Sequence, residues 1–159
     1  MANNKITKQV NYNVAIGKHF HTIAEGCAAF GLKPDKQGWQ ILAGTRFEHA
    51  TPPDKALKDV ILWFPNKRNA YWNNASPSQL DRIVETPKNT TKNQKQVDKF
   101  LNKYELRITF LKDKGDYRFV GVYELDIDET QIQNKCIWKR VLCQFSADLH
   151  EIKEYLLTR

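Results

Sequence analysis

The sequence predicts an α+β fold, built on a strongly bent, mostly antiparallel sheet or an open β-barrel with about three flanking helices. One observation is a hairpin, because residues 105–112 and 117–127 alternate apolar and polar positions on either side of a turn at residues 113–116. A second is that about five strands are recognisable, most of them consecutive or hairpin-linked, which argues against a layered βαβ fold. A third is the length of 159 residues, which favours a single domain over residues 1–159.

The first half of the chain is expected to hold one helix and three strands. Residues 1–12 carry no clear periodicity and are expected to be partly mobile. Residues 18–30 place apolar side chains at helical spacing, and Gly31 stands where a helix commonly stops. Short apolar or alternating runs bounded by glycine, proline or threonine predict strands at residues 38–47, 59–64 and 81–85.

The second half holds the clearest helix, predicted over residues 91–104. Its apolar stripe recurs at i, i+3, i+4 and i+7 and consists of Val97, Phe100, Leu101 and Tyr104. After the hairpin, in which Gly121 predicts a bend or a close backbone approach, residues 136–145 are predicted as a strand. Ser146 is expected to cap a final helix.

The charge favours a polyanion as partner. The net charge is +7 and the isoelectric point about 9.3, which fits nucleic acid or another polyanion. Of the nucleic acids, DNA is the expected partner rather than RNA. Three cysteines, Cys27, Cys136 and Cys143, are too few and too irregular for a disulfide framework and fit a reducing compartment. No apolar run approaches the ~20 residues that span a bilayer, and the polar N-terminus lacks a signal-peptide core. A cytoplasmic location, away from membranes, is therefore expected.

Motifs for catalysis or for a cofactor are not recognised. The sequence has no P-loop, no dinucleotide-binding glycine motif and no nucleophile elbow. His19-x-His21 falls in the predicted helix 18–30, where the two side chains would diverge, so no metal site is predicted. Asp126, Asp128 and Glu129 cluster after a strand, and a solvated junction is the commoner explanation of such a cluster.

Basic side chains are the first group that suits nucleic acid. Four lysines recur along one side of the predicted helix 91–104, a spacing that can follow a phosphate backbone, although a solvated helix face looks the same. Cations near the aromatic segment and on the hairpin extend this set. The predicted phosphate-binding residues are Lys67, Arg68, Lys92, Lys95, Lys99, Lys103, Arg107 and Arg118.

Aromatic side chains are the second group, since tryptophan and tyrosine offer flat faces to an unstacked base. In the segment WFPNKRNAYWNN, Trp63 and Phe64 are expected in the core, whereas Tyr71 and Trp72 stand in a polar loop and are the best candidates for base contact. The amides of Asn73 and Asn74 can read a base edge. Trp39 and Trp138 are candidate pocket walls, although each alternates with apolar residues and is slightly better explained as core.

The stretches YRFVGVYELDIDETQIQNKCIWKRV and DVILWFPNKRNAYWNN resemble accessory domains of prokaryotic HNH-type nucleases and helicases. The order of aromatic strands, lysine helix and bent hairpin is similar to the PUA-like superfamily, which includes SRA, EVE, ASCH and YTH domains. The sequence lacks the G-x-K-x-x-E/R segment of ASCH domains and a clear YDG stretch of SRA domains, so the subfamily stays open. The resemblance implies a small curved barrel that binds nucleic acid, with a flipped, modified base in an aromatic cage.

Three functions follow from these patterns. The leading one is a nucleic-acid-binding domain without a catalytic role, cofactor or metal, in which a flipped or modified base lies against Tyr71 and Trp72. The second is a small metal-dependent nuclease or nucleotide-processing enzyme that uses Asp126, Asp128 and Glu129 with His49 or Arg46. The third is a protein-interaction or inhibitor module, with a protein partner, in phage defence or counter-defence.

Overall fold

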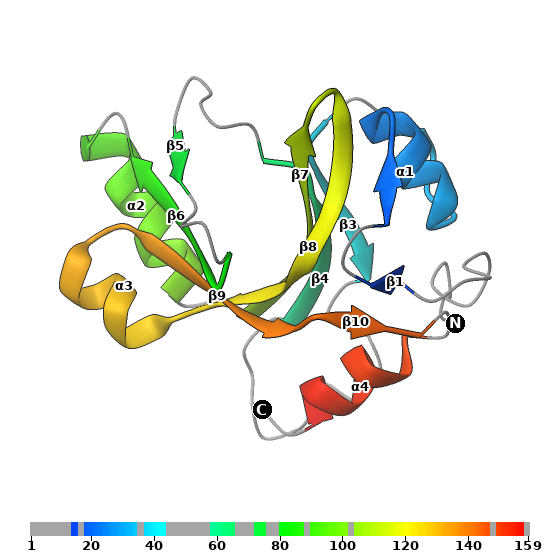
Figure 1. Cartoon of the computed structure of the whole chain (residues 1–159). Helices are drawn as coiled ribbons and strands as arrows, with labels where there is room; N and C mark the ends of the chain where they lie inside the picture. The colour runs from blue at the N-terminus through cyan, green and yellow to red at the C-terminus, as the bar shows by residue number, and fades with distance from the viewer. Residues whose placement is uncertain are drawn as a thin grey trace.

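The computed structural model describes residues 14–15, 18–34, 37–43, 58–65, 72–75, 80–87, 90–101, 104–146 and 149–157. Four helices and ten strands lie in these ranges (Figure 1). In chain order they are β1 Val14–Ala15, β2 His19–Phe20, α1 Ile23–Ala29, β3 Trp39–Ala43, β4 Lys58–Trp63, β5 Trp72–Ala75, β6 Arg82–Pro87, α2 Thr90–Leu101, β7 Tyr104–Asp113, β8 Asp116–Leu125, α3 Ile127–Gln133, β9 Cys136–Leu142, β10 Gln144–Phe145 and α4 His150–Leu157.

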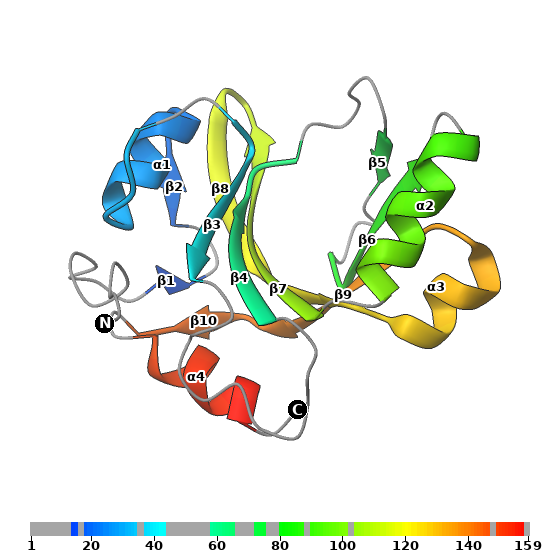
Figure 2. The same ribbon diagram turned by 180° about the vertical axis from the view of Figure 1, so that it is seen from behind.

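The central sheet is open and strongly bent, as the sequence predicts. Its strand order is β3-β4-β7-β8-β9-β6-β5, with β2 paired to β8 beside this path. Only the β4–β7 pair is parallel among the described strand pairs of this sheet. Figures 1 and 2 show the sheet bent into a U, with β5 and β6 facing β4 and β7 and with β9 crossing the base. The expected α+β, PUA-like architecture is confirmed.

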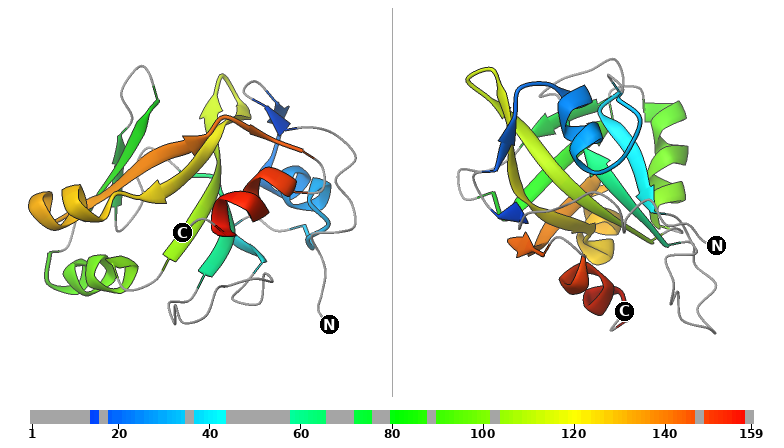
Figure 3. Two further views of the ribbon diagram at one scale, coloured as in Figure 1. Left: turned by 90° about the horizontal axis from the view of Figure 1, so that it is seen from below. Right: turned by 90° about the vertical axis from the view of Figure 1, so that its right-hand side faces the viewer.

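The two faces of this sheet are covered by different helices. Figure 3 (left) shows α2 and α3 on one side of the sheet and α1 and α4 on the other. The face toward α1 and α4 buries an apolar cluster in which Phe110 lies within 6.2 Å, between ring centroids, of four other phenylalanine rings: Phe20, Phe30, Phe64 and Phe119. The inner face of the U, which we call the concave face, buries a second cluster with Trp63, Tyr123 and Trp138, closed on one side by α2.

Gly121 marks the point at which β8 changes its alternation. Its φ is +144°, and the register with β7 shifts between Thr109 and Phe110. Phe119 and Val122 therefore belong to the cluster under α1 and α4, whereas Val120 and Tyr123 belong to the concave face. A Cβ on Gly121 would lie 2.4 Å from Cδ of Arg140, which is too close, so glycine is required here. The predicted bend is confirmed, and the strict two-residue alternation predicted for 117–127 is wrong.

Most predicted elements are confirmed, with four local differences and one wrong helix cap. Helix α4 begins at His150, and Ser146 donates to Glu151 instead of capping the helix. The predicted helix 18–30 is shorter, because residues 19–20 form β2 and Thr22 caps α1 by accepting from the Glu25 N–H. Residues 72–75, predicted as part of a polar loop, form β5. Helix α2 ends at Leu101, and Tyr104 already begins β7.

The fourth difference is α3, which the sequence analysis missed. Asp126 caps this helix, since its Oδ1 accepts from the backbone N–H of Glu129 at 3.1 Å, and Asn134 ends it in the left-handed region. The apolar sequence neighbours of the three cysteines predict a packed, apolar setting for each of them. Cys27 and Cys136 are buried, but Cys143 is exposed, so that expectation is wrong for Cys143.

Candidate nucleic-acid interface

The concave face carries a row of tryptophans contributed by strands β3, β4 and β9. Trp39 of β3 lies directly opposite Trp63 of β4, and residues so paired in an antiparallel ladder project to the same face. The Trp63 and Trp138 rings lie 5.8 Å apart, so β4 and β9 are in contact across the U. Trp63 and Trp138 are buried, whereas Trp39 is 37% exposed. This row therefore runs from the interior of the U to a solvent-exposed aromatic at an edge strand.

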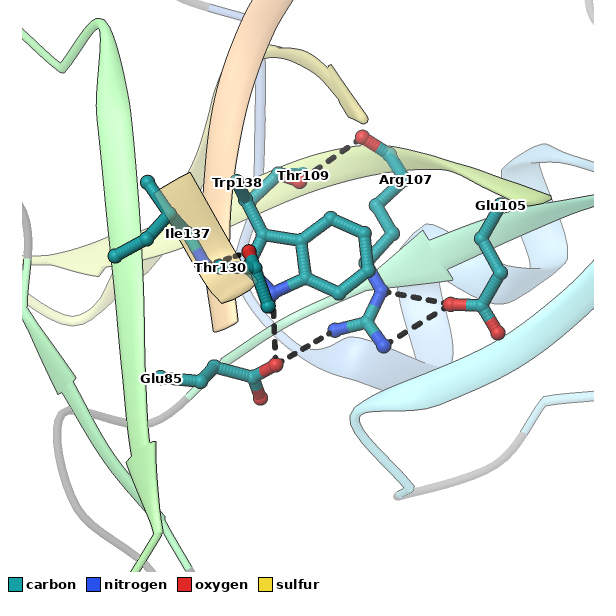
Figure 4. A network of polar contacts seen from close by, with 7 residues as sticks. All are labelled: Glu85, Glu105, Arg107, Thr109, Thr130, Ile137 and Trp138. Carbon is teal, nitrogen blue, oxygen red and sulfur yellow. Dashed lines mark hydrogen bonds and ion pairs between the residues drawn. The ribbon is translucent and has the colours of Figure 1, made fainter. Parts of the chain in front are cut away.

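A buried ion network lies beside these rings (Figure 4). Arg107 Nη2 lies 3.0 Å from Oε2 of Glu105, and Arg107 Nη1 lies 3.3 Å from Oε1 of Glu85. The guanidinium carbon is 3.8 Å from the ring centroid of Trp138 and 4.5 Å from that of Trp63. Delocalised, weakly hydrated guanidinium groups suit such stacked positions. The network joins β4, β6, β7 and β9 on the concave face.

One oxygen of Glu85 contacts both Trp138 and Arg107. The indole N–H of Trp138 donates to Oε1 of Glu85 at 2.8 Å, and the same oxygen contacts Arg107. Burial raises the pKa of Glu85, against the lowering influence of Arg107 and of the indole hydrogen bond. Two carboxylates face one guanidinium, so the network carries an excess negative charge when all three groups are ionised. Trp138 is held in one orientation by this arrangement.

The network corrects two expectations. Arg107 was expected on an exposed face of the hairpin, ready for phosphate, but it is 1% exposed and its fork is occupied by carboxylates. The reason is that the far face of β7 points into the U rather than into solvent. Trp138 is 1% exposed, so its candidate role as an open pocket wall is wrong, and the slight preference for a core position is confirmed. The network could have been anticipated, since Glu105-x-Arg107 places opposite charges on the same face of a strand.

The other predicted base-contacting residues lie at the opposite edge of the sheet. Trp72, Asn73 and Asn74 belong to β5, the last strand of the order that begins with β3. Their backbone pairs with β6, and Asn74 stands opposite Glu85 in the register. Tyr71 lies outside the described residues. The structure therefore places the predicted aromatics Trp39 and Trp72 on the two edge strands of the open sheet.

The predicted phosphate-binding residues are spread over two regions. Lys95 and Lys99 are exposed on α2, whose Val97 is buried on the concave side, so they lie on the outer flank of the U. Lys92 also belongs to α2. Arg118 is half-buried on β8 near the hairpin turn. Lys67, Arg68 and Lys103 lie outside the described residues.

The acidic residues of the alternative nuclease site have a structural role. Asp126 caps α3 and lies 3.6 Å from Nη1 of Arg82, while Asp128 and Glu129 occupy the first turn of the helix. Carboxylates at a helix N-terminus are stabilised by its dipole, which accounts for the cluster. His49 and Arg46 lie outside the described residues. Within the described ranges, no three metal-binding side chains are grouped to hold an ion.

A comparison with protein families matches residues 8–147 to the SRA domain, the SET and RING associated domain. The chain belongs to this family. SRA domains are part of the PUA-like superfamily, so the resemblance drawn from the strand and helix order is confirmed and the subfamily is settled as SRA. The match covers most of the chain, including the concave face and the hairpin. Family membership supports the expectation of a nucleic-acid-binding domain.

Among solved structures, the SRA chain is similar to the 5-hydroxymethylcytosine-specific restriction enzyme AbaSI. The TM-score is 0.57 at 21% sequence identity, and the match covers 84% of this chain and 42% of the enzyme. The chain therefore spans less than half the length of that enzyme, and the likeness shows a shared fold. No curated protein sequence matches the chain. None of the helices in the described part of the chain is long and apolar enough to cross a membrane.

Proposed function

We propose that this SRA domain binds DNA and reads a modified base on the concave face of its sheet. The observation that carries the proposal is the row from buried Trp63 to exposed Trp39, in a chain of the SRA family. The modification named for AbaSI, 5-hydroxymethylcytosine, is the first base to test, because the two folds are similar. No catalytic role is proposed for the described residues.

The two edge strands would hold the base between them. Trp39 on β3 and Trp72 on β5 stand at opposite ends of the strand order, and Tyr71, Asn73 and Asn74 adjoin Trp72. Extruding a base costs a few kcal/mol, and stacking on an aromatic side chain returns about 1–3 kcal/mol. Asparagine amides add hydrogen bonds to the base edge. Buried Trp138 would form the interior floor of this site, and its ring is fixed by the hydrogen bond to Glu85 and by stacking with Arg107.

Phosphate contacts would surround this site. Lys95 and Lys99 expose two charges on the outer flank of α2, and Lys92 lies one turn before Lys95. Lys67, Arg68 and Lys103 are proposed on the sequence pattern alone. Because such contacts release counterions, affinity should fall steeply as salt rises.

The test is a fluorescence-anisotropy titration of duplex and single-stranded DNA that carries cytosine, 5-methylcytosine or 5-hydroxymethylcytosine at one position. We expect a preference for one modified base, and Trp39→Ala should reduce that preference about tenfold or more, the value of one lost stacking contact. Ile132→Ala is the matched control, since Ile132 is an exposed apolar side chain on α3, 75% exposed. Equal affinity for all three bases, or no affinity for DNA, would overturn the proposal.

A further inference from the structure

The turn of the β7–β8 hairpin and strand β2 together form a charged surface that the base-reading proposal does not use. His19 pairs with Arg118 and Phe20 with Tyr117 in the β2–β8 ladder. Phe20 is buried in the core under α1, so the residues on either side of it, His19 and His21, project outward together. The earlier expectation that these two histidines diverge on a helix is therefore wrong. Their ring centroids lie 6.2 Å apart.

Both histidines face one carboxylate of the hairpin. Nδ1 of His21 lies 2.7 Å from Oδ1 of Asp116, and Nε2 of His19 lies 3.9 Å from Oδ2 of the same residue. Glu25 of α1 accepts from the backbone N–H of His21 at 2.8 Å. The hydrogen bond to Asp116 raises the pKa of His21, with smaller contributions from the negative charges of Asp116 and Glu25. The same hydrogen bond lowers the pKa of Asp116, with smaller contributions from the charges of His21, His19 and Arg118. The imidazolium form of His21 is thus favoured at this surface.

Permanent cations flank the hairpin turn on both faces of the strand pair. Arg118, paired with His19, shares the face of the histidines, whereas Lys112, paired with Tyr117, shares the face of Phe20. Lys112 lies opposite Tyr117 in the β7–β8 ladder, with its Nζ 5.8 Å from the Tyr117 ring centroid, and Lys18 holds the same distance from the Phe20 ring. Lys114 and Gly115 form the turn itself, both at positive φ and both exposed. We call this surface the hairpin patch, and its basic members are Lys18, His19, His21, Lys112, Lys114 and Arg118.

The size of the positive charge on the hairpin patch depends on its histidines. Four permanent cations stand with the carboxylates of Glu25 and Asp116, and Asp113 is a third acidic residue in the sequence beside the turn, so the formal surplus is a single positive charge while the histidines are neutral. Protonation of both histidines raises the surplus to three. Such a surplus attracts a phosphate backbone, and the attraction strengthens as the positive charge increases.

The hairpin patch lies near the exposed tryptophan of the concave face. Trp39 stands opposite Trp63, and Trp63 stands opposite Thr109 of β7. Four residues separate Thr109 from Asp113 at the turn, a distance of about 13 Å along an extended strand. That distance corresponds to about four nucleotide steps of a duplex, at about 3.4 Å per step along each strand. DNA bound at the concave face with its axis along β7 would therefore reach the patch.

We propose that the hairpin patch is a contact surface for the DNA phosphate backbone, and that His19 and His21 strengthen this contact when they are protonated. The inference rests on the proposed function and adds to it a second surface with its own pH dependence. Asp116 holds the histidines in place and limits the attraction at neutral pH. The patch carries no base specificity, since phosphates are the same beside every base.

The first test uses unmodified duplex DNA and the exposed lysines, which lie outside the core. In the double variant Lys112→Ala/Lys114→Ala, we expect about a tenfold loss of affinity, and a slope of log affinity against log salt that is smaller by about 0.9 for each lost contact. The control, Lys135→Ala/Lys153→Ala, removes the same charge from α4 and from the loop after α3. If the lysine double variant has the same salt slope as the parent chain, the proposed phosphate contact at the hairpin patch is wrong.

The second test addresses the histidines. Between about pH 7.5 and about pH 5.5, either side of the ordinary histidine pKa near ~6.5, DNA affinity of the parent chain should rise, and His19→Gln/His21→Gln should remove most of that rise. His150→Gln, an exposed histidine on α4, is the matched control and should leave the rise intact. An identical pH profile for the histidine double variant and the parent would reject the role of the histidines.

The two proposals fail in different ways. If the parent chain binds no DNA, the proposed function fails, and the proposed phosphate contact at the hairpin patch, which depends on it, fails as well. If DNA binds with a base preference that the lysine variants leave intact in both affinity and salt slope, only the patch fails. Uniform weakening of modified and unmodified DNA by the lysine variants is the result that supports the patch.

Discussion

The face of the sheet under α1 and α4 and the concave face bury different kinds of side chain. The first is closed by phenylalanine and aliphatic residues, with Phe110 in the middle of four other rings. The second buries Arg107 with Glu85 and Glu105 among tryptophan rings. Apolar packing alone would stabilise the second face as well, since replacing a buried ion pair by apolar groups is often neutral or stabilising.

The difference suggests what each face is for. Burial of charge costs free energy that packing of phenylalanine does not cost, so the concave face contributes less to stability than its size allows. In return, fixed hydrogen bonds hold Trp138 and its neighbours in one arrangement. The phenylalanine face stabilises the fold, and the concave face holds in order the side chains at which we propose that a modified base binds. Substitutions on the two faces should therefore have different consequences.

The largest effect is expected from Arg107→Met. This change leaves Glu85 and Glu105 buried without their shared cation, and removing one partner of a buried pair costs roughly 3–5 kcal/mol. Urea unfolding followed by tryptophan fluorescence measures the loss. The triple variant Glu85→Gln/Glu105→Gln/Arg107→Met is the control and should recover much of the stability. A loss below about 1 kcal/mol for the single variant would show that the network is not charged as described.

A smaller effect is expected from Phe110→Leu on the opposite face. An apolar swap of similar volume in a packed core usually costs less than about 1.5 kcal/mol, and no buried charge loses a partner. The same urea titration measures it, and DNA affinity should stay that of the parent chain. If Phe110→Leu cost as much as Arg107→Met, the contrast between the two faces would be lost.

The sequence predicted the fold better than it predicted the site. The hairpin, the α2 stripe and the bend at Gly121 follow from local periodicity and local sterics, which a single sequence contains. Helix α3 was missed because a helix of seven residues has too few turns for a clear period. Its capping signal was present, since Asp126 is followed three residues later by Glu129.

The misjudged site residues have a common cause. Alternation along β7 shows that Arg107 and Leu106 point to opposite faces, but it does not show that both faces are buried. That follows only from the bending of the sheet, which brings Trp138 of β9 over Arg107 of β7. His19 and His21 were assigned to a helix for a similar reason, since a two-residue strand is defined by its partner β8 and not by its own sequence.

The smallest effect on stability, and the most specific, is expected from Glu85→Gln. Burial raises the native pKa of Glu85 above its ordinary value of 4.5, so above that pH the native state keeps a proton that the unfolded chain has released. Stability falls with rising pH wherever the native state binds more protons, so Glu85 weakens the fold as the pH rises from 4.5 through its native pKa. Glutamine does not titrate, and its oxygen can still accept from Trp138 and Arg107.

Stability of Glu85→Gln relative to the parent chain should therefore improve as the pH rises from 4.5, while the difference near pH 4.5 stays within about 1 kcal/mol, the value of one altered hydrogen bond. Urea midpoints of both proteins across this range measure the difference, in which the other titrating groups cancel. Phe110→Leu should keep a constant offset from the parent, because it changes no titrating group. A relative stability of Glu85→Gln that declines with rising pH would mean that Arg107 outweighs burial and that the native pKa of Glu85 is lowered. The concave face would then be an ordinary ion-paired core, and the contrast with the phenylalanine face would be one of composition alone.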